Sequence, residues 1–243
     1  RVLLKVGSFH AETFEELFQG TRAIPWEEYL PKDAKFWVAK ASSIKSKLFS
    51  PSDIQSIMKK AMVERMKLID RWALMNNTGK ENIAEHSHTV AVIAHALALI
   101  GNKKFGRSYN AERCALLALY HDTTEVITGD MPTPVKYYND TIRRAYKEIE
   151  ATAGDRLLAM LPEEFRPDYD PCFHPDPADK ELWQLVKAAD KISALIKCIE
   201  EDRMGNREFE MALRAQEVKV EAIDLPEVAY FRKEFMPAYY LTL

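Results

Sequence analysis

The sequence predicts a mainly α protein: a helical bundle preceded by a small N-terminal α+β fragment of β-α-β-α order. The chain has 243 residues and only eight glycines, too few for a turn-dense β protein. From residue 66 onward, apolar residues recur three and four positions apart, a spacing typical of amphipathic helices. The residues before 66 alternate instead between short strand-like and helix-like runs. We therefore expect two domains, residues 1–65 and 66–243.

The N-terminal fragment is expected to hold two strands and two helices. Arg1–Phe9 and Ala34–Ala41 resemble strands, and Thr13–Gly20 predicts a short helix that stops at its glycine. Ser50 to Asp53 predicts a helix start, since serine or aspartate caps a helix and proline fits its first turn. Such a fragment leaves strand edges open, so we expect it to pair with a second copy or to dock on the helical body.

The second domain is expected to be helix after helix. The predicted helices are Val63–Leu68, Ile83–Ile100, Ala111–Thr123, Asn139–Met160, Asp179–Met204, Arg207–Val220 and Pro226–Met236. The stretches rich in Asn, Gly and Pro between them, Asn76–Gly79, Gly129–Pro134 and Pro162–Pro177, predict connections.

Charge and composition exclude some functions. Lys+Arg 34 against Asp+Glu 37 gives a net charge of -3, which excludes a strongly basic nucleic-acid-binding protein. The longest apolar stretch, Ala91–Ile100, is interrupted by His95 and predicts no membrane span. The three cysteines lack CxxC spacing, and Cys114 and Cys198 fall at apolar helical positions, so we expect buried thiols in a reducing cytoplasm. The chain begins at Arg1, which indicates that the natural start lies upstream.

A set of histidines and aspartates predicts a metal site. His121 and Asp122 are adjacent at the end of an apolar helical run, and Glu125 follows on the expected same helical face. His86 and Asp190 each lie inside another apolar-periodic helix. Two imidazoles and two carboxylates suit a divalent cation such as Mn, Fe, Co, Ni or Zn. One buried histidine or aspartate is more often simply hydrogen-bonded, so the ordered set of four is the specific signal.

The remaining histidines carry less information. His88 and His95 share the predicted helix of His86 but not its face, so we expect them to pack or to be exposed. His10 and His174 have no evident partners in the sequence.

The ligand order resembles that of the HD-domain metal-dependent phosphohydrolases. The segments MKLIDRWALM, ENIAEHSHTVAVIAHALALI, LALYHDTTEVITGDMPTPVKYYN and LVKAADKISALIKCIEE are similar, more closely, to the YfbR-type 5'-deoxynucleotidases of bacteria. The resemblance runs from about residue 64 to the C-terminus. It implies an all-α HD-domain bundle, one divalent ion for which cobalt or manganese serves, a homodimer, and hydrolysis of deoxyribonucleoside 5'-monophosphates.

The resemblance also implies roles for individual residues. The implied metal ligands are His86, His121, Asp122 and Asp190. Glu125 corresponds to the carboxylate that activates water, Arg71 to the arginine that orients the phosphate, and Trp72 to the ring beside the sugar. The nucleotide is expected to contact Arg71, Trp72, His86, Asp122, Asp130, Met131, Pro132, Thr133 and Asp190, with Asp130 at the sugar 3'-hydroxyl. The residues alone leave plainer alternatives: a surface ion pair for Arg71, a core position for Trp72, and a turn cap before Pro132 for Asp130.

The first 65 residues resemble a different family. They are similar to the ferredoxin-like and THUMP part of ribosomal RNA methyltransferases, but no Gly-rich cofactor loop follows, so methyl transfer is not expected. RNA binding by this fragment remains an alternative. Its basic residues, Lys40, Lys45, Lys47, Lys59 and Lys60, are scattered, as on most solvated surfaces.

Two further alternatives concern the helical part. Another HD-domain hydrolase, such as an alarmone hydrolase, would share the metal ligands. That group usually has an acidic residue directly after the glutamate, whereas Val126 follows Glu125 here. The chain could also be an inactive regulatory fusion, although the complete ligand set, Arg71 and Glu125 argue against it.

Overall fold

The computed structural model describes residues 65–136 and 138–241, together with residues 8, 10, 16, 19, 22–25 and 28. The chain divides into two compact units, Arg1–Lys60 and Ala61–Leu243, and each is considered by itself. The predicted strands Arg1–Phe9 and Ala34–Ala41 and the predicted helices at Thr13–Gly20 and Ser50 lie outside the described residues, apart from isolated positions. The β-α-β-α fragment and the domain boundary after residue 65 therefore stay predictions.

The second unit is mainly α, as predicted. Among residues 65–136 and 138–241, the strand-like pairing is an isolated bridge between Asp70 and Asn82. Its α-helices are α3 (Ile83–Lys104), α4 (Ala111–Tyr120), α5 (Glu125–Thr128), α6 (Thr133–Lys136), α7 (Asp140–Ala159), α8 (Arg166–Phe173), α9 (Lys180–Arg203), α10 (Glu210–Glu221) and α11 (Pro226–Glu234). Short 3-10 helices are η2 (Arg65–Leu68), η3 (Glu163–Phe165), η4 (Pro177–Asp179), η5 (Arg207–Phe209) and η6 (Met236–Tyr240).

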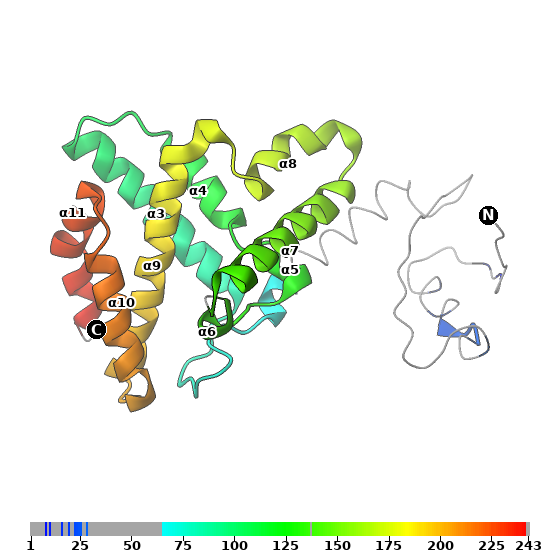
Figure 1. The fold of residues 1–243 in the computed structure, drawn as a ribbon, viewed down its shortest axis with the longest axis horizontal. Helices are drawn as coiled ribbons and strands as arrows, with labels where there is room; N and C mark the ends of the chain where they lie inside the picture. The colour runs from blue at the N-terminus through cyan, green and yellow to red at the C-terminus, as the bar shows by residue number, and fades with distance from the viewer. Residues whose placement is uncertain are drawn as a thin grey trace. The chain divides into compact units, whose positions relative to one another are not determined.

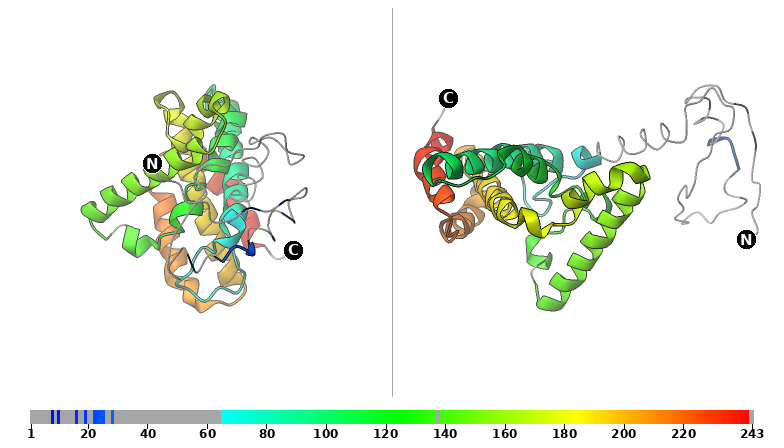
Figure 2. Two further views of the ribbon diagram at one scale, coloured as in Figure 1. Left: turned by 90° about the vertical axis from the view of Figure 1, so that its right-hand side faces the viewer. Right: turned by 90° about the horizontal axis from the view of Figure 1, so that it is seen from above.

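The core of this unit lies where α3, α4 and α9 pack together. The helix α9 also packs against α10, and α11 covers α3 (Figure 1). The helix α7 diverges from this bundle, with α8 packed against it (Figures 1 and 2). Apolar side chains of the three central helices fill the core, among them Val90, Leu97, Leu117, Leu185 and Ile192. Their burial supplies the main driving force for folding.

The helix α3 begins at a capping box and is the most apolar element. The Asn82 side chain accepts a hydrogen bond from the Glu85 backbone N–H, and the Glu85 side chain accepts one from the Asn82 N–H. With 22 residues, α3 is long and apolar enough to cross a membrane by length and composition alone, although its longest uninterrupted apolar stretch is shorter. Half of its most apolar 18-residue segment is buried inside the bundle.

Short helices account for most differences from the predicted elements. The stretch Pro162–Pro177, predicted as a connection, contains α8 with Pro171 inside it. Proline removes one backbone hydrogen bond there. The ring of Tyr120 packs edge-on against Tyr169 and Phe173 of α8, with centroids 6.0 and 6.1 Å away. Tertiary packing therefore holds a helix that propensity does not predict.

His174 ties α8 to α7, so the expectation that it lacks partners was wrong. Its Nδ1 lies 2.7 Å from Asp170 Oδ1 and its Nε2 lies 3.4 Å from the Ala151 carbonyl oxygen. The ring passes over Gly154, where an added Cβ would come within 2.9 Å of Nε2. A larger residue at position 154 would therefore force the His174 ring to shift.

The loop before α3 is held by the C-terminal end of α9. Glu201 is fully buried and accepts hydrogen bonds from the backbone N–H groups of Thr78 and Gly79 and from the side chains of Asn206 and Lys197. Burial alone would raise the pKa of Glu201, but these donors outweigh it and lower the pKa to about 2. One buried carboxylate therefore holds Thr78 and Gly79 of this loop in place.

We expect Glu201→Gln to lower the free energy of unfolding at pH 7 by about 3 kcal/mol, because the folded state binds the ionised carboxylate far better than the unfolded state does. A lowered folded-state pKa stabilises above the unfolded value and loses that stabilisation as the pH falls. The difference between variant and wild type should therefore shrink below about pH 4.5 and toward pH 2. Urea unfolding of both proteins at several pH values measures this difference in the free energy of unfolding. Glu208→Gln, at an exposed carboxylate that binds Asn76 of the same loop, should cost about 1 kcal/mol or less.

Candidate metal centre

His121 and Asp122 lie in a turn, not in a helix. The helix α4 ends at Tyr120 and not at Thr123 as predicted, and His121 is its C-cap. The Nδ1 of His121 lies 2.7 Å from the Ala118 carbonyl oxygen, which would otherwise face the end of the helix. Because a carbonyl oxygen only accepts, Nδ1 carries the proton and the Nε2 of the neutral ring keeps its lone pair.

His86 is presented by the first turns of α3. Its side chain is fully buried, and its Nδ1 lies 3.2 Å from the Ser193 hydroxyl of α9. Its Nε2 lies 3.1 Å from Asp190 Oδ1 and 3.6 Å from Asp122 Oδ2. The imidazole is therefore fixed on one side by Ser193 and faces two carboxylates on the other.

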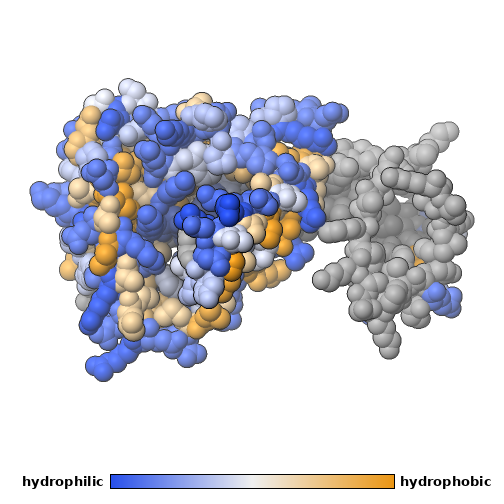
Figure 3. Space-filling model, in the orientation of Figure 1, coloured by the Kyte–Doolittle hydropathy of each residue, from blue (hydrophilic) through white to orange (hydrophobic). Residues whose placement is uncertain are grey.

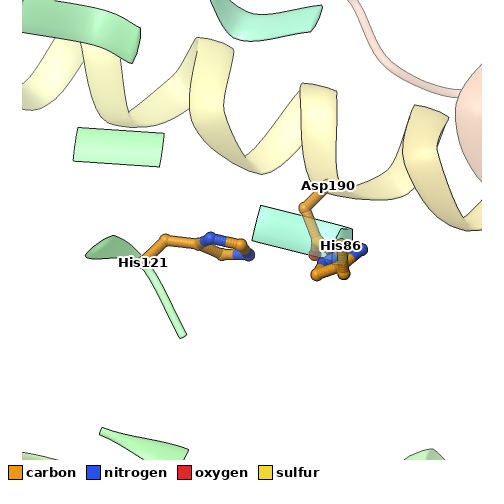
Figure 4. A group of neighbouring side chains, drawn as sticks. All are labelled: His86, His121 and Asp190. Atoms are coloured by element: carbon orange, nitrogen blue, oxygen red, sulfur yellow. Dashed lines mark ion pairs between the residues drawn. The ribbon is translucent and has the colours of Figure 1, made fainter. Parts of the chain in front are cut away.

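The four predicted ligands, called here the ligand cluster (His86, His121, Asp122 and Asp190), converge from three elements. One ligand atom each from His86, His121 and Asp190 lies within 4.8 Å of the others. Figure 4 shows the two rings and the Asp190 carboxylate facing one another from α3, the end of α4 and α9. Asp122 joins them, with Oδ2 3.1 Å from His121 Nε2. Spacings of this kind suit atoms that share one cation.

The unsatisfied atoms of the cluster fit a metal. The Nε2 atoms of His86 and His121 are both buried and have no hydrogen-bond partner, although carboxylate oxygens lie close by. The short distances between these nitrogens and the carboxylate oxygens are therefore not hydrogen bonds. A buried polar atom without a partner costs free energy, and a divalent cation coordinated by both nitrogens would remove that cost.

The neighbouring charged groups of the cluster strongly shift the pKa values of its two carboxylates. Burial alone would raise the pKa of Asp122, but His121, His86 and Arg71 outweigh it and hold the pKa well below its usual range. Burial also opposes ionisation of Asp190, whose pKa is lowered by His86 and His121. Both carboxylates are therefore ionised at neutral pH and available as metal ligands.

Glu125 lies beside the cluster in a separate short helix. It is the first residue of α5 and not, as predicted, one helical turn after His121 on the same face, because the chain turns between Tyr120 and Glu125. Its side chain is 5% exposed, and Oε2 is buried without a hydrogen-bond partner. Burial, and then the charges of Asp122 and Asp130, raise the pKa of Glu125 to about 9. A pKa raised this far keeps the carboxyl group protonated at neutral pH unless a nearby cation favours its ionised form.

Arg71 lies at the edge of the cluster, and Trp72 follows it in the chain. Arg71 Nη1 lies 3.3 Å from Asp122 Oδ2, and with a side chain only 14% exposed this is not the surface ion pair of the plainer alternative. Burial would lower the pKa of Arg71, but Asp122 and other carboxylates raise it. Trp72 is half-buried, has a positive φ of 58°, and packs its ring 5.4 Å from that of Phe209.

The predicted nucleotide loop begins with Asp130. Gly129 (φ 73°) turns the chain out of α5, and α6 begins at Thr133. Burial raises the pKa of Asp130, while the positive charge of Arg71 lowers it and the negative charge of Asp122 raises it. The Pro132 carbonyl accepts hydrogen bonds within α6. Contact of the nucleotide with residues 130–133, including Met131, stays a prediction.

Sequence reasoning missed two residues that contact the site. Ser193 follows Asp190 by one helical turn on α9, so helix periodicity could have placed it beside the ligands. Glu81 lies 3.3 Å from Arg71 Nε and accepts a hydrogen bond of 3.2 Å from Trp72 Nε1. It lies in a loop, where no periodic pattern indicates which neighbours a side chain meets.

Comparison with known proteins decides the family. The family described as "5'-deoxynucleotidase YfbR-like" matches residues 60–239. The chain belongs to the YfbR-like 5'-deoxynucleotidases. A 5'-deoxynucleotidase of Vibrio atlanticus is 54% identical over 183 residues, which cover 75% of this chain and 94% of that protein. The 5'-deoxynucleotidase YfbR of Escherichia coli is 49% identical over 75% of this chain and 92% of its own length. The resemblance inferred from the motifs is confirmed.

Two further comparisons concern the N-terminal part and the fold. The THUMP domain family matches residues 11–93, as the resemblance predicted, and overlaps the YfbR-like match from residue 60. An HD-domain phosphohydrolase of Listeria innocua has a similar fold, with a TM-score of 0.65 and 23% identity over 76% of this chain and 89% of that one. A conserved hypothetical protein of Pyrococcus furiosus matches with a TM-score of 0.58 and 26% identity, over 75% of this chain and 98% of that one. The HD-domain fold of the helical unit is confirmed.

We expect Co²⁺ or Mn²⁺ to raise the Tm of the metal-free protein, because a cation relieves the repulsion between ionised Asp122 and Asp190. At a hundredfold excess over Kd the gain is about 3 kcal/mol. Asp190→Asn should lose most of the rise in a thermal-shift titration. His88→Ala, at an exposed histidine of the same helix as His86, should keep it. An equal rise in wild type and Asp190→Asn would contradict the site.

Proposed function

We propose that this YfbR-like protein is a metal-dependent phosphomonoesterase that hydrolyses deoxyribonucleoside 5'-monophosphates to deoxynucleoside and phosphate. The observation that carries the proposal is the ligand cluster itself, with two buried Nε2 atoms facing carboxylates, Arg71 paired with Asp122, and the buried Glu125 three residues after Asp122. Relatives named 5'-deoxynucleotidase, at about half identity over most of their length, support the substrate class.

The proposed reaction needs a nucleophilic water and a neutralised phosphate. One divalent ion held by His86, His121, Asp122 and Asp190 would lower the pKa of a bound water and polarise the phosphoryl oxygens. Arg71, already fixed beside Asp122, donates to the non-bridging oxygens and offsets the charge that develops on them. A bound cation, like the charge of Arg71, would favour the ionised form of Glu125, and in that form Glu125 takes the proton of the attacking water.

The same site explains a preference for deoxyribose. Trp72 follows Arg71 in the chain and has a half-buried ring, and we propose that the sugar C2' packs against this ring. A ring in van der Waals contact with C2' leaves no room for a hydroxyl and offers it no hydrogen bond. Asp130, with Met131, Pro132 and Thr133, would hold the rest of the nucleotide, Asp130 accepting from the 3'-hydroxyl. The face of the helical unit that Figure 3 shows is mainly hydrophilic and is hollowed between α9 and α7.

Further details of the proposal concern the metal and the assembly. We propose cobalt or manganese as serving ions, since nitrogen and oxygen ligands suit both. We also propose a cytoplasmic homodimer. Exposed apolar side chains on the neighbouring helices α3 and α4, Val92, Leu99, Leu116 and Leu119, support a protein contact there. Residues 1–65 would form a separate domain.

The decisive experiment is a phosphate-release screen of deoxyribo- and ribonucleoside 5'-monophosphates with Co²⁺, Mn²⁺, Mg²⁺ or chelator. We expect metal-dependent release that is faster with every deoxyribonucleotide than with its ribose counterpart. Release that chelator does not abolish would contradict the metal site. Equal rates on both sugars would remove the role assigned to Trp72.

We expect Glu125→Gln to keep the metal and lose turnover. The substitution removes the proton acceptor but leaves all four ligands in place, so kcat should fall about 10²- to 10⁴-fold. Metal content after dialysis, by atomic emission, should equal that of wild type. Near wild-type kcat in this variant would exclude Glu125 as the base.

A further inference from the structure

Glu81 lies behind the proposed phosphate and sugar contacts, and nothing in the sequence pattern singles it out. Its side chain is only 14% exposed. One carboxylate oxygen, Oε2, lies 3.2 Å from the indole Nε1 of Trp72 and 3.3 Å from Nε of Arg71. The two residues are chain neighbours with different proposed tasks. A single oxygen atom therefore touches both.

The backbone brings Glu81 to this position. The Arg71 N–H donates to the Glu81 carbonyl oxygen at 2.8 Å, and the Ile83 N–H donates to the Ile69 carbonyl at 3.0 Å. These bonds flank the isolated bridge between Asp70 and Asn82 and hold the two segments antiparallel. The carboxylate thus reaches Arg71 and Trp72 from a fixed backbone.

Trp72 needs such an external restraint. Its φ of 58° lies in the left-handed region, which is unfavourable for a bulky side chain and persists only where the surroundings enforce it. Three side chains enforce it here. Glu81 accepts from the indole, the Asn77 amide donates to the Trp72 carbonyl oxygen at 3.2 Å, and the ring packs on Phe209. Of these, only Glu81 fixes the ring by a hydrogen bond.

Arg71 is held between two carboxylates. Its Nη1 contacts Asp122 of the ligand cluster, and its Nε faces Glu81 without forming a hydrogen bond. Because the two contacts involve different nitrogens of a planar group, they fix its plane. Without the charge of Glu81, the guanidinium could turn fully toward Asp122, to which Nη1 already donates, and away from the phosphate.

We propose that Glu81 is a positioning residue that sets the orientation of Arg71 through its charge and that of Trp72 through its acceptor oxygen. The proposal rests on the function proposed above. Its consequence is that phosphate capture and deoxyribose selectivity depend on one side chain that touches neither group, and that the two effects separate by substitution. Glu81→Gln keeps an acceptor for the indole but removes the charge, whereas Glu81→Leu removes both.

Glu81 also lies near a metal ligand, which offers a competing role. Its Oε1 is 3.9 Å from His86 Nδ1, but the Ser193 hydroxyl is closer at 3.2 Å and is enough to hold that nitrogen. We therefore expect Glu81→Leu to retain the wild-type metal content. Loss of metal from this variant would overturn the proposal, because Glu81 would then act through His86.

The test compares kcat/KM for a deoxyribonucleotide and its ribose counterpart across variants. Glu81→Gln should lower both values about tenfold and leave their ratio unchanged. Glu81→Leu should lower the ratio as well, by about tenfold. Trp72→Phe, which keeps a ring but lacks the indole N–H, should lower the ratio similarly, and combining it with Glu81→Leu should add little. Asp70→Asn, at an exposed carboxylate of the same bridged segments, should change neither value.

The outcomes separate the two proposals. If wild type shows no deoxyribose selectivity, the proposed function fails. If wild type is selective and Glu81→Leu is equally selective, the role of Glu81 fails while the function stands. Should Glu81→Leu not fold, Glu81→Gln with Trp72→Phe carries the test, and an unchanged kcat/KM in Glu81→Gln overturns the proposal.

Discussion

Two buried imidazole nitrogens at the junction of α3, the end of α4 and α9 impose the constraint on which the rest of this structure depends. The Nε2 atoms of His86 and His121 are buried and lack hydrogen bonds, while their Nδ1 atoms are already engaged by Ser193 and by the Ala118 carbonyl. Ionised Asp122 and Asp190 face the same space. The free energy of this arrangement is unfavourable without a cation, and a divalent cation bound between the four side chains would make it favourable.

The surroundings of the cluster hold this arrangement in place. The helix α9 supplies Asp190 and Ser193 at its middle, and near its end it supplies Glu201, which binds the loop that follows Trp72. One helix thus positions a metal ligand, the partner of another ligand, and the segment that carries the proposed sugar contact. Packing of α9 against α3 and α4 therefore sets the geometry of the whole site.

The sequence predicted that the four side chains of the ligand cluster come together, because their residue types and positions in apolar helical segments can be recognised from the sequence alone. It did not predict where the helix before His121 ends, since the imidazole itself bonds to a carbonyl of the last turn, that of Ala118. The short helices α5, α6 and α8 were missed because tertiary packing, and not propensity, holds them. Arg71 and Trp72 followed only from the family resemblance. Glu81 was missed because its contacts depend on a bridge between two loop segments.

The central claim is that His86, His121, Asp122 and Asp190 bind one divalent ion together. A crystal of the protein soaked in Co²⁺ or Mn²⁺, with anomalous diffraction collected at the metal edge, tests it directly. The account predicts one strong anomalous peak, about 2.0–2.2 Å from both Nε2 atoms and from an oxygen of each aspartate. A peak bound by other residues, or a site in which either imidazole turns away from the ion, would contradict it.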